Sequence, residues 1–126
     1  MEELIGRIVT NVGVDRSIAE KAVGIILDFL SKEGPPEKVQ ALIDSMPGAA
    51  ALVQAARSDE GGGGLGGLIG GMGGIMGVGS RLMGAGLGMG EIQGVTREII
   101  AYTREQAGED AVGEVVGAIP GLSQFI

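Results

Sequence analysis

The sequence of 126 residues contains no cysteine, no histidine and no tryptophan, and its only aromatic residues are Phe29, Tyr102 and Phe125. Without thiols or imidazoles the chain cannot form a disulfide, a zinc finger, an iron–sulfur cluster or a serine or cysteine triad. Because no Gly-Lys pair occurs, a Walker-type phosphate loop is excluded as well. We therefore expect a protein that is not an enzyme, with no catalytic, cofactor-binding or metal-binding residues and no cofactor.

Positive charge is also scarce. Nine Lys and Arg stand against sixteen Asp and Glu, which gives a net charge of −7. No basic face could neutralise a phosphate backbone, so nucleic acid is not an expected partner. The sequence begins Met1-Glu2-Glu3-Leu4-Ile5, which is acidic where a secretory signal is basic. We therefore expect no cleaved leader and a cytoplasmic location.

Glycine, in contrast, is abundant, and its distribution divides the chain into three zones. Residues 61–90 hold sixteen of the 26 glycines, four of the six methionines and a single charge, Arg81. Residues 1–60 and 91–126 have the composition of ordinary helical protein. The expected organisation is an N-terminal helical unit (1–60), a glycine-rich apolar segment (61–90) and a C-terminal helical hairpin (91–126).

The first zone is punctuated as a series of helices. Asp15, or a Ser17–Glu20 capping box, starts a helix that Gly34-Pro35-Pro36 ends, and Pro36 suits the first position of the next helix. That next helix ends at Pro47-Gly48. Shorter helices are expected over 2–11 and 49–57. The apolar residues of the two main helices recur at helical spacing: Ile18, Ala22, Ile25, Ile26, Phe29 and Leu30, then Val39, Leu42, Ile43 and Met46.

The last zone follows the same plan as the first. A shift of 73 residues superimposes 22–53 on 95–126 without a gap, and Pro47-Gly48 then falls on Pro120-Gly121. Most apolar positions coincide, so that Phe29 matches Tyr102, whose expected role is core packing rather than catalysis. We interpret the chain as two copies of a helix–turn–helix hairpin. The predicted fold is all-α, with the two hairpins packed as a small bundle and joined by the glycine-rich segment.

The glycine-rich segment combines two patterns. Residues 61–64 are typical of a flexible linker. From 65 to 76 the apolar residues instead follow helical spacing, so a helix is predicted there, although glycine costs about 1 kcal/mol per helix position relative to alanine. The alternative is a hydrophobic hinge that orders only against a partner. The apolar residues of this segment form the expected contact surface: Leu65, Leu68, Ile69, Met72, Ile75, Met76, Leu82, Met83 and Leu87.

Carboxylates cluster at one place, where Glu109, Asp110 and Glu114 lie at the start of the predicted last helix. We interpret them as charges that complement the helix dipole rather than as ligands of a metal. They do not follow the alternating spacing of a calcium-binding loop.

The sequences "VQALIDSMPGAAALV" and "AGEDAVGEVVGAIPGLSQFI", on either side of a Gly/Leu/Met tract, resemble a group of uncharacterised bacterial domain families. This group has a Leu/Gly-rich middle and a terminal "IPGL" motif, and it includes the VcgC/VcgE-like proteins. The resemblance covers the second hairpin and the tract, with a looser likeness in the first hairpin. It implies a bacterial, all-helical protein and brings no activity or cofactor.

Together these observations predict a protein-interaction or self-assembly module, with a second copy or another protein as its partner. Two alternatives remain. The uncharged stretch 61–80 has the length of a membrane span, although it is mostly glycine and the acidic chain would not be attracted to anionic lipid. The aliphatic and methionine side chains could instead line a site for an acyl chain between the hairpins.

Overall fold

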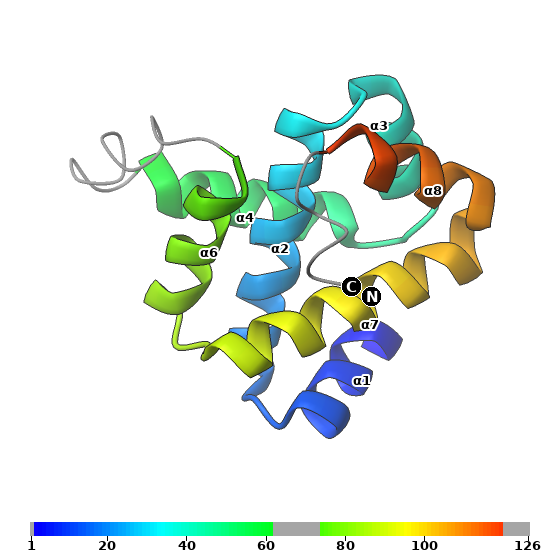
Figure 1. Cartoon of the computed structure of the whole chain (residues 1–126). Helices are drawn as coiled ribbons and strands as arrows, with labels where there is room; N and C mark the ends of the chain where they lie inside the picture. The colour runs from blue at the N-terminus through cyan, green and yellow to red at the C-terminus, as the bar shows by residue number, and fades with distance from the viewer. Residues whose placement is uncertain (1, 62–73, 120–126) are drawn as a thin grey trace.

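The computed structural model describes residues 2–61 and 74–119, and the side chains of 2–57 and 78–119 (Figure 1). Within these ranges every regular element is a helix, which confirms the predicted all-α fold. The helices are α1 (Glu2–Val12), α2 (Arg16–Glu33), α3 (Pro36–Asp44), α4 (Ala49–Gly61), α6 (Gly74–Gly84), α7 (Met89–Ala107) and α8 (Glu109–Ala118).

Helix α2 is the centre of the fold. It contacts α1, α3, α4, α6 and α7, and in Figure 1 it runs through the middle of the molecule. Its sequence explains this position, because residues 22–30 are apolar on almost every side and all are buried. A helix that is apolar all round must be covered on several faces.

The two predicted hairpins pack together. They correspond to α2–α3 and α7–α8, and α3 contacts both α7 and α8. Under the 73-residue shift, the first residue of α3, Pro36, falls on the first residue of α8, Glu109. Buried positions also coincide, as for Phe29 with Tyr102 and for Met46 with Ile119. Helix positions and burial therefore agree with the shift, while an internal repeat as such stays a prediction.

Several helix bounds differ from those expected. Asp15, and not Ser17, is the residue before the first turn of α2, and its side chain makes no capping hydrogen bond. Helix α4 continues to Gly61, four residues beyond the predicted end. The part of the predicted 65–76 helix before Gly74 lies outside the described residues. Helix α6 then continues past Met76 to Gly84, since no proline or charge repulsion interrupts the helical spacing of Val78 and Leu82.

A single hydrophobic core collects residues from all three zones. The α1–α4 region contributes Leu4, Ile8 and most of α2, whereas α7 and α8 contribute Val95, Ile99 and Val112. Residues 78–90 contribute the buried side chains of Val78, Leu82 and Leu87. Because these three side chains are continuous with the rest, the described part of the glycine-rich zone joins the same core.

Helices α2 and α4 approach each other at backbone distance. A Cβ atom placed on Gly24 of α2 would lie 2.3 Å from the carbonyl oxygen of Leu52 and 3.3 Å from Cβ of Ala56. Real Cβ atoms do not come this close to a backbone oxygen, so only glycine fits at position 24 with α4 where it is. Small residues at such a crossing let two helices lie close together.

An exposed glycine in α8, Gly113, allows the helical state of this segment to be tested. A Cβ atom on Gly113 would meet nothing within 4 Å. The substitution Gly113→Ala is therefore expected to stabilise the protein by about 0.5–1 kcal/mol through helix propensity alone. Urea denaturation followed by circular dichroism measures this difference. A loss of stability would mean that residue 113 is not in an exposed helical position.

Candidate functional site

Among the side chains that the structure describes, one acidic side chain lies inside the fold. Asp28 on α2 has no solvent-exposed surface, whereas both chain neighbours, Leu27 and Phe29, belong to the apolar core. Burying a carboxylate is costly unless it is paired and hydrogen-bonded. The partners of Asp28 therefore decide how this part of the molecule is held together.

Three cations from three helices surround this carboxylate. Arg57 Nε of α4 donates to Asp28 Oδ1 at 2.8 Å, and Arg81 Nη1 of α6 donates to Oδ2 at 3.3 Å. Lys32, one turn further along α2, lies with Nζ 3.2 Å from Oδ2. Two further bonds extend the network, because Arg57 Nη2 donates to Ser31 Oγ at 3.1 Å and Arg81 Nη2 donates to the Ala56 carbonyl oxygen at 3.3 Å. We call Asp28, Lys32, Arg57 and Arg81 the Asp28 cluster.

The cluster keeps Asp28 ionised. Burial by itself would raise the pKa of Asp28, but the hydrogen bonds from Arg57, Lys32 and Arg81 outweigh burial and hold that pKa below its ordinary value. A carboxylate that stays ionised at neutral pH and has its oxygens engaged by three cations is poorly suited to exchange protons with a substrate. The arrangement joins α2, α4 and α6 instead.

The lowered pKa has a consequence for stability at acid pH. A group whose folded-state pKa is depressed stabilises the fold above its unfolded pKa, which for Asp is about 3.9, and the contribution is lost as the pH falls through the folded pKa. The stability difference between the native protein and Asp28→Asn should therefore be constant at neutral pH and shrink below about pH 4. Urea midpoints at several pH values measure it. A difference that stays unchanged at pH 2 would contradict the assignment of an ionised Asp28.

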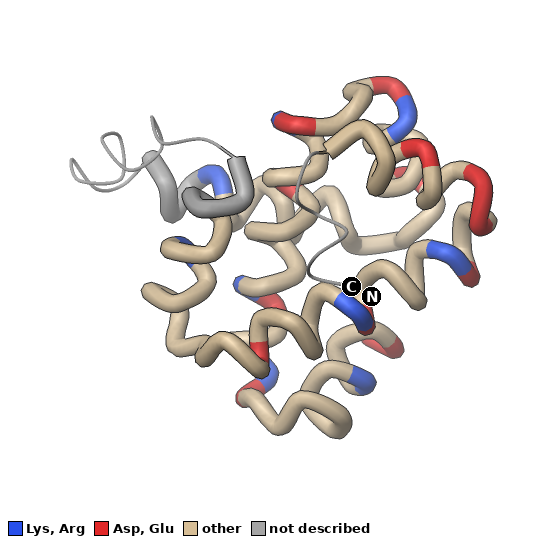
Figure 2. The backbone as a smooth tube through the Cα atoms, viewed as in Figure 1, with Lys and Arg blue, Asp and Glu red and all other residues tan. Residues whose placement is uncertain are grey.

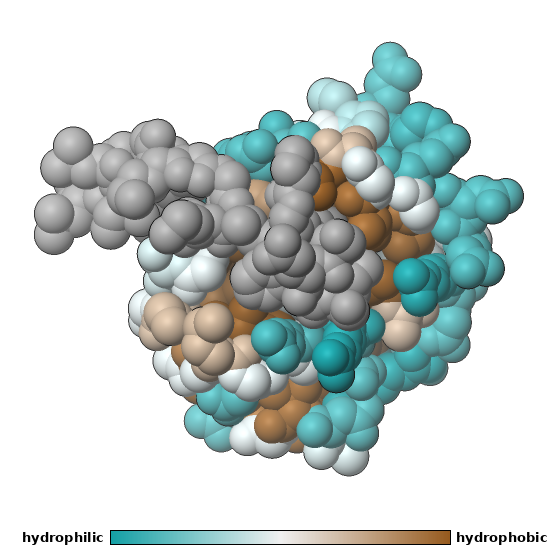
Figure 3. Space-filling model, in the orientation of Figure 1, coloured by the Kyte–Doolittle hydropathy of each residue, from teal (hydrophilic) through white to brown (hydrophobic). Residues whose placement is uncertain are grey.

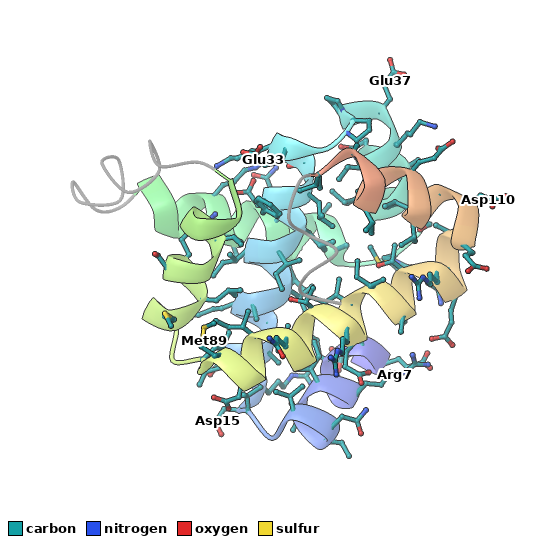
Figure 4. All side chains as sticks on the ribbon, viewed as in Figure 1. Arg7, Asp15, Glu33, Glu37, Met89 and Asp110 are labelled. Atoms are coloured by element: carbon teal, nitrogen blue, oxygen red, sulfur yellow. The ribbon has the colours of Figure 1, made fainter. Side chains whose placement is uncertain are left out.

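The acidic residues predicted at the last helix lie on the surface, away from the Asp28 cluster. Glu109 and Asp110 are in the first turn of α8, and Asp110 points outward in Figure 4. Glu114 forms an ion pair with Lys38 of α3. Figure 2 shows acidic residues along the outer edge formed by α3 and α8. Among the residues whose side chains are described, no group of three acidic residues could hold a metal ion.

The structure describes only some side chains of the predicted contact surface, and these differ in exposure. Four of its residues, Leu65, Leu68, Ile69 and Met72, lie outside the described residues. Ile75 and Met76 belong to α6, but their side chains are not among those described. Met83 is 52% exposed, as a contact surface requires.

Leu82 and Leu87 do not fit the prediction, because they are only 1% and 4% exposed. Leu82 is on the face of α6 that packs into the core, and the turn after α6 folds Leu87 inward, where its N–H donates to the Leu82 carbonyl oxygen at 3.1 Å. In this structure they are core residues of the chain itself. Helical spacing groups apolar residues on a face but does not show what covers that face.

Met89, which the sequence-based surface did not include, is 59% exposed at the start of α7. Figure 4 places it at the corner where the chain passes from α6 to α7, and Figure 3 shows pale brown, apolar atoms over this corner. We call the exposed pair Met83 and Met89 the corner methionines. Among the residues whose side chains are described, they are the large apolar residues classed as exposed.

Sequence reasoning missed Asp28 altogether. The available signal was its position within the run Val23-Gly24-Ile25-Ile26-Leu27-Asp28-Phe29-Leu30, where a lone charge stands among apolar residues. A charge in such a run is either at a helix face that meets solvent or buried with partners. The cations Arg57 and Arg81 are 29 and 53 residues away in the sequence, so local spacing does not identify them.

None of the helices that the structure describes combines the length and the apolar character needed to cross a bilayer. Comparisons of the chain with family models, with curated proteins and with solved structures gave no match.

Proposed function

We propose that the protein is a non-enzymatic helical module that associates with a second copy of itself or with another protein. Its contact surface comprises the corner methionines and the predicted contact residues whose side chains the structure does not describe: Leu65, Leu68, Ile69, Met72, Ile75 and Met76. The observation that carries this proposal is the exposure of Met83 and Met89, at 52% and 59%, within the charge-poor, glycine-rich zone 61–90. Exposed methionines are adaptable contact residues because the side chain is flexible and polarizable.

The charge distribution supports association at this corner. The chain carries a net charge of −7, so two copies repel each other over most of their surfaces. From residue 74 to residue 90 the only charged residue is Arg81, which is bound to Asp28 and only 20% exposed. Residues 74–90 themselves bring no acidic side chain to the α6–α7 corner, and the carboxylate of Glu91, which follows them, accepts a hydrogen bond from the Gly88 N–H.

Two further parts of the proposal rest on the sequence. The "IPGL" motif and the Gly/Leu/Met tract support a bacterial protein similar to the VcgC/VcgE-like group. The agreement of apolar positions between 22–53 and 95–126 supports duplication of one hairpin.

Size-exclusion chromatography with light scattering, over a range of protein concentrations, tests the proposal. The native protein is expected to associate, and the double variant Met83→Ser, Met89→Ser is expected to dissociate at concentrations at least about tenfold higher. The matched control is Ala101→Ser with Ala118→Ser, two exposed positions on α7 and α8. Circular dichroism on the same samples checks that the variants remain helical.

Two results would contradict the proposal. In one, the double methionine variant associates as strongly as the native protein, so the corner is not part of the interface. In the other, the native protein is a monomer at every concentration and captures no protein partner.

A further inference from the structure

Helix α6 has little helical stability of its own. Four of its eleven residues are glycine, at positions 74, 77, 79 and 84. Each glycine lowers the helix equilibrium by about a factor of five relative to alanine. A helix of this length is already marginal in isolation. The helical state of α6 therefore depends on its docking against the rest of the molecule.

The side chains described in α6 dock it in two ways. In the described part of α6, the apolar side chains buried in the core are Val78 and Leu82. Arg81 lies between them and provides the polar link, because its guanidinium donates to Asp28 of α2 and to the Ala56 carbonyl oxygen of α4. Helix α4, in contrast, meets α2 at backbone distance through Gly24. The described glycines of α6 make no such approach, since a Cβ atom at Gly79 or Gly84 would meet nothing within 4 Å.

The Asp28 cluster can lose Arg81 without leaving the carboxylate of Asp28 unpaired. If Arg81 moves away, Asp28 keeps the hydrogen bond from Arg57 and the ion pair with Lys32. No buried carboxylate is left unpaired, which is the event that makes the breaking of buried ion pairs expensive. The guanidinium of Arg81 is transferred to water, where it is well solvated.

The connection between α6 and α7 permits this movement. Gly86 has a φ of +109°, a conformation that L-residues other than glycine rarely adopt, and glycines at 84 and 88 stand on either side. A Cβ atom at Gly84 would meet nothing within 4 Å. The backbone can therefore change direction here without side chains that obstruct it.

We infer that α6 opens from α2 as a unit, independently of the remaining helices, with the Arg81–Asp28 ion pair as its latch. Opening exposes Val78 and Leu82 next to Met83 and so enlarges the apolar contact surface at the α6–α7 corner. That opening of α6 regulates association rests on the proposed function, whereas the opening itself does not. It also gives Leu82, which sequence spacing assigns to the contact surface but the closed structure buries, a state in which it is accessible.

Amide hydrogen exchange on the full chain, measured at low protein concentration, tests the latch. We expect α6 amides to exchange at least about tenfold faster than those of α2 and α7, through local opening. Arg81→Gln removes the ion pair without changing helix propensity and should accelerate exchange in α6 by about another tenfold. Gly79→Ala, whose Cβ would meet nothing within 4 Å, should slow it about fivefold.

The matched control is Arg57→Gln, which removes the other arginine from the same carboxylate. It should accelerate exchange mainly in α4. The inference is overturned if α6 exchanges as slowly as α2, or if Arg81→Gln accelerates α2, α7 and α8 as much as α6.

The same variants separate the latch from the proposed function. If α6 opens on its own while association is unaffected by Met83→Ser and Met89→Ser, the latch stands and the proposed function falls. If association depends on these methionines but α6 exchanges only together with the other helices, the proposed function stands and the latch falls.

Discussion

Replacing Gly24 by alanine is expected to destabilise the protein by about 3 kcal/mol, the upper part of the range for an overpacked core position. The added Cβ would lie 2.3 Å from the Leu52 carbonyl oxygen and 3.0 Å from its carbon. These are backbone atoms, so the contact cannot be relieved by rotation of a side chain. Helix α4 must move away from α2, which separates the buried side chains of Val53 and Ala56 from the core. Urea denaturation measures the loss.

The control for Gly24→Ala is the same change elsewhere in a helix. Gly6 of α1 is helical, and a Cβ atom there would meet nothing within 4 Å. Gly6→Ala should therefore stabilise the protein by about 0.5–1 kcal/mol. If both variants shift stability in the same direction, the close approach of α2 and α4 at position 24 is wrong.

Asp28→Asn is expected to cost about 3 kcal/mol, near the lower end of what the removal of one partner from a buried ion pair costs. Asparagine keeps the size of the side chain but removes the charge that compensates Lys32, Arg57 and Arg81. The loss stays near the lower end because those cations are 49%, 47% and 20% exposed and can be partly solvated. Thermal and urea unfolding of the two proteins at neutral pH give the difference.

Asp44→Asn is the matched control for Asp28→Asn. Asp44 is an exposed aspartate at the end of α3 that accepts one hydrogen bond from Gln40 at 3.0 Å. Its substitution should change stability by no more than about 0.5 kcal/mol. Equal losses for the two variants would mean that Asp28 is solvated rather than the buried centre of a cluster.

These two predictions concern different kinds of attachment to the same central helix. Gly24 allows α4 to approach α2 at backbone distance, whereas Asp28 holds α6 through a single guanidinium. A steric fit is lost only when α4 moves as a whole, whereas in the proposed opening α6 takes only Arg81, Val78 and Leu82 of its described side chains away from α2 and the core. This difference is why we expect α6, and not α4, to regulate the apolar corner.

Local sequence was sufficient for most of the helices. The proline at position 36 starts α3, because its fixed φ and missing N–H suit the first helical turn, and α1 matches the expected 2–11 within one residue. The all-α fold was predictable for the same reason, since apolar residues recur at a period near 3.6 and helix-breaking residues separate the runs. Spacing along the chain determines which residues share a helical face.

Only the tertiary structure decided what covers each face. Leu82 and Met83 are adjacent in one apolar segment, yet Leu82 is buried against the core and Met83 is 52% exposed. Asp28 acquires its role from Arg57 and Arg81, which local spacing along α2 cannot specify. Gly24 is indispensable because Leu52 passes beside it, not because α2 needs a glycine there. The physical reason is common to all three. Burial, pairing and close approach depend on residues distant in the sequence, whereas the spacing and the breaking residues that set the bounds of most of these helices lie within about one turn of each other.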